Sequence, residues 1–242
     1  MFIYPTLNQD QCKRFTVYAE YLQKQNKVCN LTRIIEQDQI YVRHFADSLE
    51  LLSHLDNTLT TGKNNRIIDI GSGAGLPGMA LAIARKHWHI TSIDATGKKI
   101  NFQKNAASIL KLDNFTGICA RAEELSHNTQ YRQQFDALVC RAVANLRILI
   151  EISAAFLKVG SKMIAMKGPD IDQELNQAKH AMDHLNMTLD AVIPYKVSDL
   201  AKKAQLKWDQ EDINMNLIIM TKTAPTASCY PRAYGIIKKG KF

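Results

Sequence analysis

The spacing of apolar residues predicts two helices in the first quarter of the chain. Over residues 8–26, apolar side chains recur every three or four positions, as they do along one face of a helix. Asn8 followed by Gln11 resembles a capping box and predicts that this helix begins there. Residues 36–55 predict a second helix, which has four large apolar residues on one face: Tyr41, Phe45, Leu49 and Leu52.

From residue 66 onward, short strand-like runs alternate with helical stretches. The strand-like runs are RIIDI, HITSID, NFTGICA, FDALVC and SKMIAMKG. This alternation predicts βαβ units and a parallel sheet, and two later runs, TLDAVIPYKV and NLIIMTKT, predict a terminal hairpin. We therefore expect one structural domain overall. It consists of a helical extension (1–60) packed on an α/β core (61–224), followed by a tail (225–242).

A glycine-rich turn joins the first of these strands to the helix that follows it. In RIIDIGSGAGLPGMALAIA, Gly71, Gly73 and Gly75 allow the backbone to turn sharply and to approach a ligand closely. The next helix is predicted to begin between Leu76 and Gly78, and the free N–H groups of its first turn favour a negative group. The turn is therefore a candidate ligand site.

Two kinds of ligand are compatible with this turn. Gly73, Gly75 and Gly78 match the dinucleotide fingerprint, and Asp94 lies 21 residues after Gly73, near the position of a ribose-binding acid. An NAD(P)-dependent oxidoreductase is therefore one interpretation. Asp69, however, places a carboxylate at the end of the strand, where it would repel a pyrophosphate and attract the ammonium of S-adenosylmethionine. Because no hydride-transfer signature follows, the turn favours S-adenosylmethionine as the cofactor.

Polar residues at the ends of the later strands complete the candidate donor site. Asp94 ends the second strand, where its carboxylate can accept hydrogen bonds from both ribose hydroxyls. Ala122 and Glu123 follow the third strand, where an adenine ring would lie, and Arg141 ends the fourth at the lip of the site. Open α/β sheets bind their ligands at this carboxyl edge, so these residues are expected to lie together.

Charge and cysteine content indicate the class of partner and the compartment. The formal net charge is +8, and the stretch after Asp212 has no acidic residue but carries Lys222, Arg232, Lys238, Lys239 and Lys241. A one-signed tail favours a polyanionic partner, of which nucleic acid is the commonest. The five cysteines form no CxxC pair, the N-terminus lacks secretory features, and no apolar run could span a membrane. We expect a cytoplasmic protein without a membrane partner.

Eight sequence motifs in order resemble one family. They are NLTRI, VRHFADSL, IIDIGSGAGLPG, DATGKKINF, RAEE, CRAVANL, AMKG and the tail YPRAYGIIKKGKF, and they cover nearly the whole chain. This combination is similar to the bacterial small-subunit (16S) ribosomal RNA guanine-N7 methyltransferase family, RsmG or GidB. The resemblance implies a class I S-adenosylmethionine-dependent methyltransferase fold, which is Rossmann-like with a seven-stranded, mostly parallel sheet, a C-terminal antiparallel hairpin and N-terminal helices. It also implies methylation of N7 on one guanine in the decoding-region loop of 16S ribosomal RNA. We expect this RNA to be the partner within the small subunit or an assembly particle, and the protein to act as a monomer.

The resemblance also implies donor contacts, which by motif match are Gly71, Leu76, Ala122, Glu123 and Arg141. Together with the residues derived above, the predicted donor site comprises Asp69, Gly71, Ser72, Gly73, Gly75, Leu76, Asp94, Ala95, Ala122, Glu123 and Arg141. The chain departs from many relatives at Ala95-Thr96, where they have serine, and at Leu76, where several have phenylalanine. Both changes keep the character of the site.

The chemistry implied for guanine N7 needs no general base, because this nitrogen carries a lone pair and no proton. We predict that catalysis rests on in-line positioning and requires no histidine. Arg141 and Lys167, which end the fourth and fifth strands, are the predicted catalytic residues of the target pocket. Cys140 is expected to be a buried strand cysteine rather than a nucleophile.

Candidate RNA contacts come from two segments. Arg43 and His44 share a helical turn with Asp47 and Ser48, and this group either buttresses the cofactor loop or touches RNA. In the tail, Arg232, Lys238 and Lys239 are predicted to form a flexible RNA clamp, with Tyr230 and Tyr234 offering aromatic faces for unpaired bases. No metal site is predicted, because His180 and His184 lack a third ligand. A non-catalytic RNA-binding protein on the same fold remains the other alternative.

Overall fold

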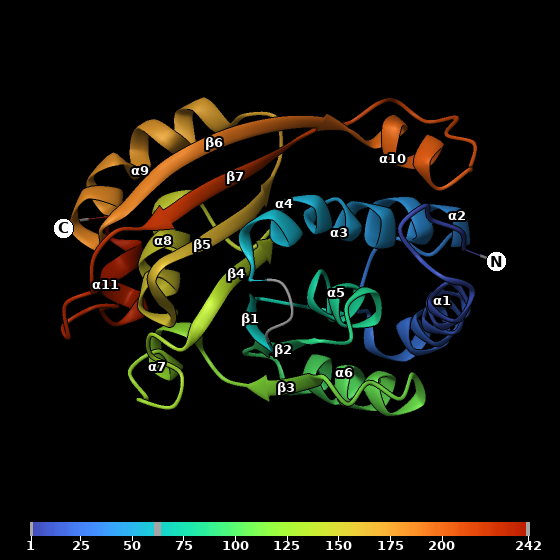
Figure 1. The fold of residues 1–242 in the computed structure, drawn as a ribbon, viewed down its shortest axis with the longest axis horizontal. Coiled ribbons are helices and arrows are strands. Elements are labelled where there is room, and N and C mark those ends of the chain that lie inside the picture. Colours follow the sequence, from blue (N-terminus) through green and yellow to red (C-terminus); the bar gives the residue numbers. More distant parts are fainter. Residues whose placement is uncertain (1, 61–63, 241–242) are drawn as a thin grey trace.

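The fold is built on one twisted sheet (Figure 1). The computed structural model describes residues 2–60 and 64–240, within which seven strands follow the order β3-β2-β1-β4-β5-β7-β6. They are β1 Asn65–Ile70, β2 Trp88–Asp94, β3 Phe115–Cys119, β4 Phe135–Arg141, β5 Leu157–Lys167, β6 Met187–Lys196 and β7 Asn214–Lys222. The first five strands pair in parallel, whereas β7 runs antiparallel to both β5 and β6. The predicted seven-stranded, mostly parallel sheet with antiparallel strands at its end is confirmed, although residues 197–213, which include a helix, join β6 to β7 in place of the tight turn of a hairpin.

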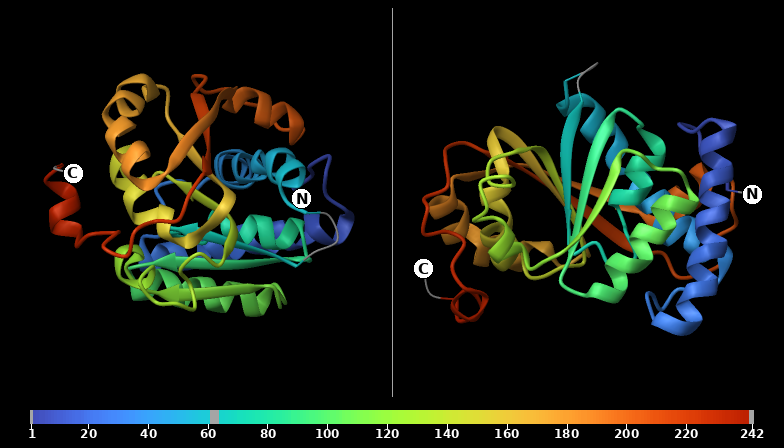
Figure 2. Two further views of the ribbon diagram at one scale, coloured as in Figure 1. Left: turned by 60° about the vertical axis from the view of Figure 1, so that its left-hand side comes forward. Right: turned by 90° about the horizontal axis from the view of Figure 1, so that it is seen from below.

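Helices cover both faces of the sheet (Figure 2). One face carries α1 Gln9–Cys29, the π-helical segment Ile40–Ala46, α3 Asp47–Leu49, α4 Leu51–Thr58, α5 Gly78–Ala84, α6 Gly97–Ile109 and α10 Val197–Lys203. The other face carries α7 Ala122–Leu125, α8 Leu146–Ser153, the 3-10 turn Ala154–Phe156, α9 Ile171–Leu185 and α11 Tyr234–Lys238. A short α2, Gln37–Gln39, leads into the π-helical segment. None of the helices described is long and apolar enough to cross a membrane.

The strand sequences are continuous apolar runs because both faces of the sheet are buried. In β1, Ile67 packs against the first group of helices, whereas Ile68 and Ile70 pack against the second. Successive side chains of a strand point to opposite faces, so a strand covered on both sides needs apolar residues at consecutive positions. This accounts for the run RIIDI in the sequence.

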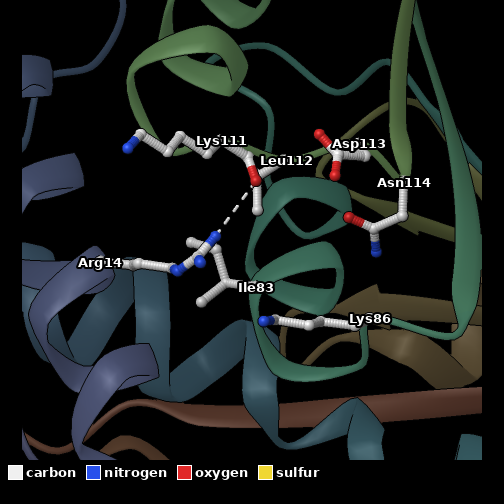
Figure 3. Close-up of a pocket in the computed structure, with 7 residues that line it drawn as sticks. All are labelled: Arg14, Ile83, Lys86, Lys111, Leu112, Asp113 and Asn114. Atoms are coloured by element: carbon white, nitrogen blue, oxygen red, sulfur yellow. Dashed lines mark hydrogen bonds between the residues drawn. The ribbon is translucent and has the colours of Figure 1, made fainter.

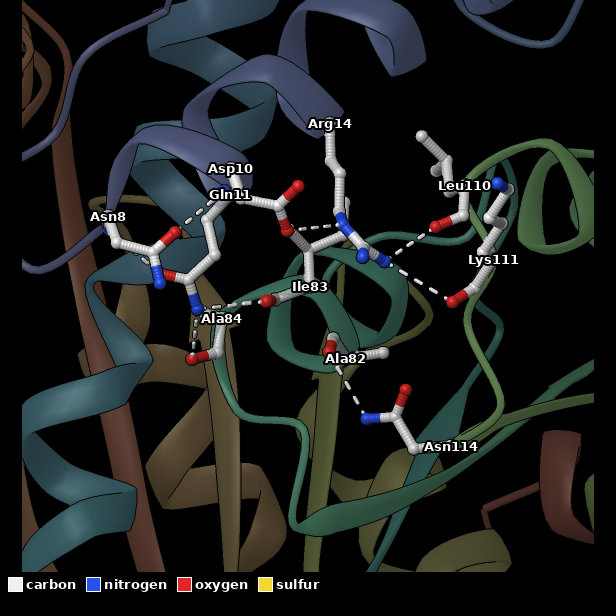
Figure 4. Close-up of polar contacts among 10 residues, drawn as sticks. All are labelled: Asn8, Asp10, Gln11, Arg14, Ala82, Ile83, Ala84, Leu110, Lys111 and Asn114. Atoms are coloured by element: carbon white, nitrogen blue, oxygen red, sulfur yellow. Dashed lines mark hydrogen bonds and ion pairs between the residues drawn. The ribbon is translucent and has the colours of Figure 1, made fainter.

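The N-terminal helices form where their apolar spacing predicts them. The capping box between Asn8 and Gln11 is present, and the four apolar residues predicted on one face of the second helix are all buried. Gln11 also donates from Nε2 to the carbonyls of Ile83 and Ala84, at 3.1 and 2.9 Å (Figure 4). Arg14 reaches the carbonyl of Leu110 at the end of α6. Since the last carbonyls of a helix lack partners within it, these bonds attach α1 to the ends of α5 and α6.

The glycine turn is held by a close contact between a strand and the next helix. The Gly78 N–H donates to Oδ2 of Asp69 at 2.8 Å, and both residues are buried. A Cβ atom at Gly78 would lie 2.7 Å from the same oxygen, closer than real Cβ atoms approach their neighbours. Gly78 is therefore required by its packing, although the sequence presents it only as the end of a glycine pattern.

We expect Gly78→Ala to lower the free energy of unfolding by about 1–3 kcal/mol, the usual cost of overpacking a well-filled interior. Chemical denaturation measures the change. Gly168→Ala is the matched control, because a Cβ at Gly168 meets nothing within 4 Å and its effect should stay below about 1 kcal/mol. Equal stability of the two variants would show that the Asp69–Gly78 contact does not constrain the turn.

Candidate active site

The carboxyl ends of β1, β2 and β3 enclose a cavity of about 160 Å³. Five of the predicted donor residues line it: Gly71, Asp94, Ala95, Ala122 and Glu123. Its apolar wall includes Ile70, Ile93, Val143 and Ile152, and Ala120, Arg121 and Tyr234 complete the lining. Carboxylates at the rim of an apolar slot suit a ligand with a flat apolar ring and hydroxyl or amino groups at its edges.

The Asp94 carboxylate is buried and oriented by two backbone groups. Its Oδ1 accepts from the Thr96 N–H at 2.8 Å, and its Oδ2 accepts from the Gly73 N–H at 3.0 Å. The Lys99 ammonium lies 3.4 Å from Oδ2. A carboxylate offers about four acceptor positions, so Asp94 retains capacity for a ligand hydroxyl at the cavity.

Other residues of the predicted donor site shape the turn instead of lining the cavity. The Ser72 hydroxyl donates to the Ile93 carbonyl at 3.3 Å. Gln103 of α6, which is fully buried, donates from Nε2 to both Ser72 Oγ and the Gly73 carbonyl at 2.8 Å. Gln103 was not among the predicted site residues, although an amide on the buried face of a helix is a signal in the sequence. Gly75 and Leu76 are buried inside the turn.

Gly73 marks the side of the turn that is open to a ligand. Its φ of +58° lies in the left-handed region, and a Cβ there would meet no atom within 4 Å. The open side of the turn therefore gives a ligand close access to the backbone.

Asp69 points into the protein, whereas the sequence predicts a carboxylate that faces the ligand. Its side chain is fully buried, is absent from the cavity wall and accepts from Gly78 at the start of α5. The free N–H groups at a helix start attract a carboxylate, which explains the inward orientation. Burial raises the pKa of Asp69 to about 7, against the opposing effects of the Gly78 hydrogen bond and the Arg141 charge.

Arg141 ends β4 as predicted, but its guanidinium is held by the N-terminal helices. Its Nη1 donates to Oδ2 of Asp47 and to the Arg43 carbonyl, both at 3.0 Å. Asp47 also accepts from the Tyr195 hydroxyl at 2.7 Å. Arg141 therefore supports the edge of the site and does not line the donor cavity. This network, which we call the Asp47 cluster, joins Arg43, His44, Asp47, Arg141 and Tyr195.

His44 is a buried member of this cluster, which corrects its assignment as an RNA contact. It is 8% exposed, and its ring contacts the Thr32 hydroxyl at 2.9 Å and the Arg141 guanidinium at 3.4 Å. Burial, reinforced by the Arg141 charge, lowers the pKa of His44 to about 3. The sequence allows this group either to buttress the cofactor loop or to touch RNA, whereas its contacts join the end of β4 to the N-terminal helices. His44 stays neutral in this position.

Lys167 ends β5 and is likewise paired within the protein. Its Nζ donates to the Ala144 carbonyl and to Oε2 of Glu174, the latter at 2.7 Å. The same Glu174 oxygen accepts from the Leu146 N–H at 2.8 Å, at the start of α8. Lys167 therefore fixes the segment between β4 and α8, which brings Val143 to the donor cavity.

The tail is packed against the core, in contrast to the flexible clamp that the sequence predicts. Arg232 forms a bidentate pair with the fully buried Glu151, with both N–O distances at 2.7 Å, so its predicted role as an RNA contact is corrected. Lys222 is also buried, whereas Lys238 and Lys239 are exposed. Lys241 lies outside the described residues.

Another cavity lies away from the carboxyl edge. Figure 3 shows Arg14, Lys86 and Lys111 around a hollow of about 270 Å³ where α1 meets the ends of α5 and α6. The Arg14 guanidinium is already bonded to Asp10 and to the Leu110 carbonyl. None of the predicted site residues lines this cavity. Over residues 2–60 and 64–240, no group of His, Cys, Asp and Glu side chains is arranged to hold a metal ion.

Comparison with known proteins identifies the family. The model of the GidB family, described as rRNA small subunit methyltransferase G, matches residues 11–203. The chain belongs to this family. Proteins named ribosomal RNA small subunit methyltransferase G, from Clostridium botulinum (strain ATCC 19397 / Type A) and Roseiflexus castenholzii, are each 34% identical to it. The alignments cover 96% of this chain and 91% and 92% of those proteins.

Solved structures support the fold. The 16S rRNA (adenine(1408)-N(1))-methyltransferase of Catenulisporales acidiphilia has a TM-score of 0.54 at 11% identity, covering 74% of this chain and 94% of that one. TYW2 of M. jannaschii in complex with AdoMet has a TM-score of 0.52 at 13% identity, covering 74% and 77%. The GidB family and these neighbours favour the methyltransferase interpretation of the glycine turn over the oxidoreductase one.

The shifted pKa of Asp69 predicts a pH dependence of stability in this GidB family member. Between about pH 4 and pH 7 the folded protein retains a proton that the unfolded chain has released, so stability should fall as pH rises through this window. Asp69→Asn cannot ionise and should not show this loss. The stability of Asp69→Asn minus that of the unmodified protein should increase from pH 4 to pH 7 in urea denaturation. A difference that is constant over this window would contradict a raised pKa.

The Asp47 cluster predicts a large effect of one substitution. Asp47→Ala leaves the mostly buried Arg141 guanidinium without its carboxylate and should cost about 3 kcal/mol of stability. Asp199→Ala is the control, because the Lys202–Asp199 pair is 76% and 56% exposed and should contribute less than about 1 kcal/mol. Similar losses in the two variants, measured by chemical denaturation, would refute a special role for the cluster.

Proposed function

We propose that this chain transfers a methyl group from S-adenosylmethionine to N7 of one guanine in the decoding-region loop of 16S ribosomal RNA. The observation that carries the proposal is the cavity at the carboxyl edge of the sheet, with Asp94 and Glu123 at its rim, in a chain of the GidB family. Membership of the family supports the proposed reaction, and the cavity supports the proposed location of the donor site.

The residues around the cavity fit the donor. Asp94 retains acceptor capacity for a ribose hydroxyl, and Glu123, which is 8% exposed, can accept from an amino group at the purine edge. Ile93 and Ile152 supply apolar surface for the ring. The open side of Gly73 leaves space for the amino-acid part of the donor beside the turn. Gly71, Ala95 and Ala122 keep the walls of the slot free of large side chains.

The reaction requires the protein to position the two reactants and does not require it to transfer a proton. Bound S-adenosylmethionine supplies a methyl group that the positive sulfonium makes electrophilic. Guanine N7 carries its own lone pair, so the protein needs only to hold the base in line with that methyl group. The neighbouring side chains agree with this: His44 is buried with a pKa of about 3, and burial raises the pKa of the Cys140 thiol to about 12. Neither is suited to act as base or nucleophile.

Arg141 and Lys167 act in this proposal on the side of the site where the guanine enters. Arg141 is tied to Asp47, and Lys167 to Ala144 and Glu174, so both brace the segment after β4.

RNA contacts are proposed for two exposed cations and one half-buried cation. Lys238 and Lys239 are exposed on the tail, and Arg43 is half-buried beside the Asp47 cluster. The substrate would be the RNA within the small subunit or an assembly particle, in the cytoplasm, with the protein acting as a monomer. The net charge of +8 favours association with such a polyanion.

Methyl transfer to ribosomal RNA tests the proposal. The purified protein, incubated with S-adenosylmethionine and small-subunit particles lacking the modification, should produce 7-methylguanosine at one position, measured by nucleoside and fragment mass spectrometry. Asp94→Ala should bind S-adenosylhomocysteine at least tenfold more weakly, because it removes charge-assisted hydrogen bonds that contribute about 1.5–3 kcal/mol each.

Asp113→Ala is the matched control, since Asp113 is exposed at the opposite edge of the sheet, in the cavity of Figure 3. It should retain both binding and methyl transfer. Methylation of another base, or unchanged donor affinity in Asp94→Ala, would contradict the respective part of the proposal.

A further inference from the structure

The C-terminal tail is held against the core by side chains that bind its backbone carbonyls. Arg132 donates to the carbonyls of Thr226, Ala227 and Tyr230 at 2.8, 2.9 and 2.9 Å. The His127 ring contacts the Pro231 carbonyl at 2.8 Å. These contacts lie on the side of the sheet covered by α7 and α8, beside which α11 lies in Figure 1.

A buried ion pair fixes the tail at its midpoint. The Arg232 guanidinium binds both carboxylate oxygens of Glu151, which is fully buried in α8. A bidentate pair of this kind fixes orientation as well as distance. Ile152, the next residue of α8, lines the donor cavity, so the tail is anchored directly beside that cavity.

A second anchor holds α11 after the ion pair. Ile237 is fully buried against the helices on this face, and its carbonyl accepts from Arg147 Nη1 at 2.9 Å. Tyr234 therefore lies between two fixed points, Arg232 and Ile237. Its position is defined by the packing of the tail on both sides.

Tyr234 reaches the donor cavity from this position. It lines that cavity together with Asp94 and Glu123, and it also lines a neighbouring hollow of about 370 Å³ together with Glu123 and Arg121. The side chain is 36% exposed, so the hydrophobic core does not account for its placement. An aromatic ring at the open rim of a slot is suited to packing against a flat ring within it.

We propose that Tyr234 forms the outer wall of the donor site and packs against the purine of S-adenosylmethionine. This inference rests on the proposed function. The residues at this end of the cavity, Ala122 and Glu123, are those expected at the adenine, which places Tyr234 at the nucleoside half of the donor. The tail thereby contributes to donor binding, although it lies far in sequence from the glycine turn.

Calorimetry with S-adenosylhomocysteine and 5′-methylthioadenosine tests this role. Tyr234→Ala should bind both ligands about tenfold more weakly, as expected for the loss of one base–aromatic stacking contact. Tyr234→Phe should keep the affinity for both, because the ring and not the hydroxyl makes the contact. Both variants should unfold at the temperature of the unmodified protein, since Tyr234 is not part of the core.

Ile236→Ala is the matched control, since Ile236 is 50% exposed on the same helix and does not line the cavity. It should bind both ligands normally. Unchanged affinity in Tyr234→Ala, an equal loss in Ile236→Ala, or a loss for S-adenosylhomocysteine alone would each overturn the proposal. If the unmodified protein binds neither ligand, the proposed function itself fails, which is a distinguishable result.

Discussion

The Asp94 carboxylate joins the two loops that form the donor cavity. One oxygen accepts from Gly73 in the turn after β1, and the other accepts from Thr96 at the start of α6. Neighbouring parallel strands end at the same edge of a sheet, so one side chain can organise both loops. The remaining parts of the site depend on this arrangement. Gln103 of α6 donates hydrogen bonds to Ser72 and Gly73 and so holds the turn after β1 in place. The buried Asp69 holds the far end of the turn to α5.

The cations at the ends of β4 and β5 use their charges inside the protein. Arg141 is paired with Asp47, and Lys167 is paired with Glu174. In each case a strand end is linked to a distant helix, the first to the N-terminal extension and the second to α9. The segment between β4 and α8 is therefore fixed from two directions. A reaction that relies on alignment and not on proton transfer benefits from such a rigid edge.

The sequence predicted the sheet, the helices around it and the placement of Asp94, Ala122 and Glu123, because these follow from local patterns. An apolar run predicts a buried strand, and the polar residue that follows it predicts a position at the carboxyl edge of the sheet. Tyr195 and Asp47, by contrast, are separated by 148 residues and meet only in the folded chain. Charge content alone could not separate Arg232, which is paired with Glu151, from the exposed Lys238 and Lys239. The inward orientation of Asp69 depends on the packing of α5, which no local pattern encodes.

A crystal structure of the protein with S-adenosylhomocysteine would show whether the slot beside Asp94 binds the donor. We expect the ribose to lie within hydrogen-bond distance of the Asp94 carboxylate and the purine to lie in the slot beside Ala122, Glu123 and Ile152. A ligand bound elsewhere, for example in the cavity between Arg14 and Lys111, with the slot at Asp94 empty, would contradict this expectation.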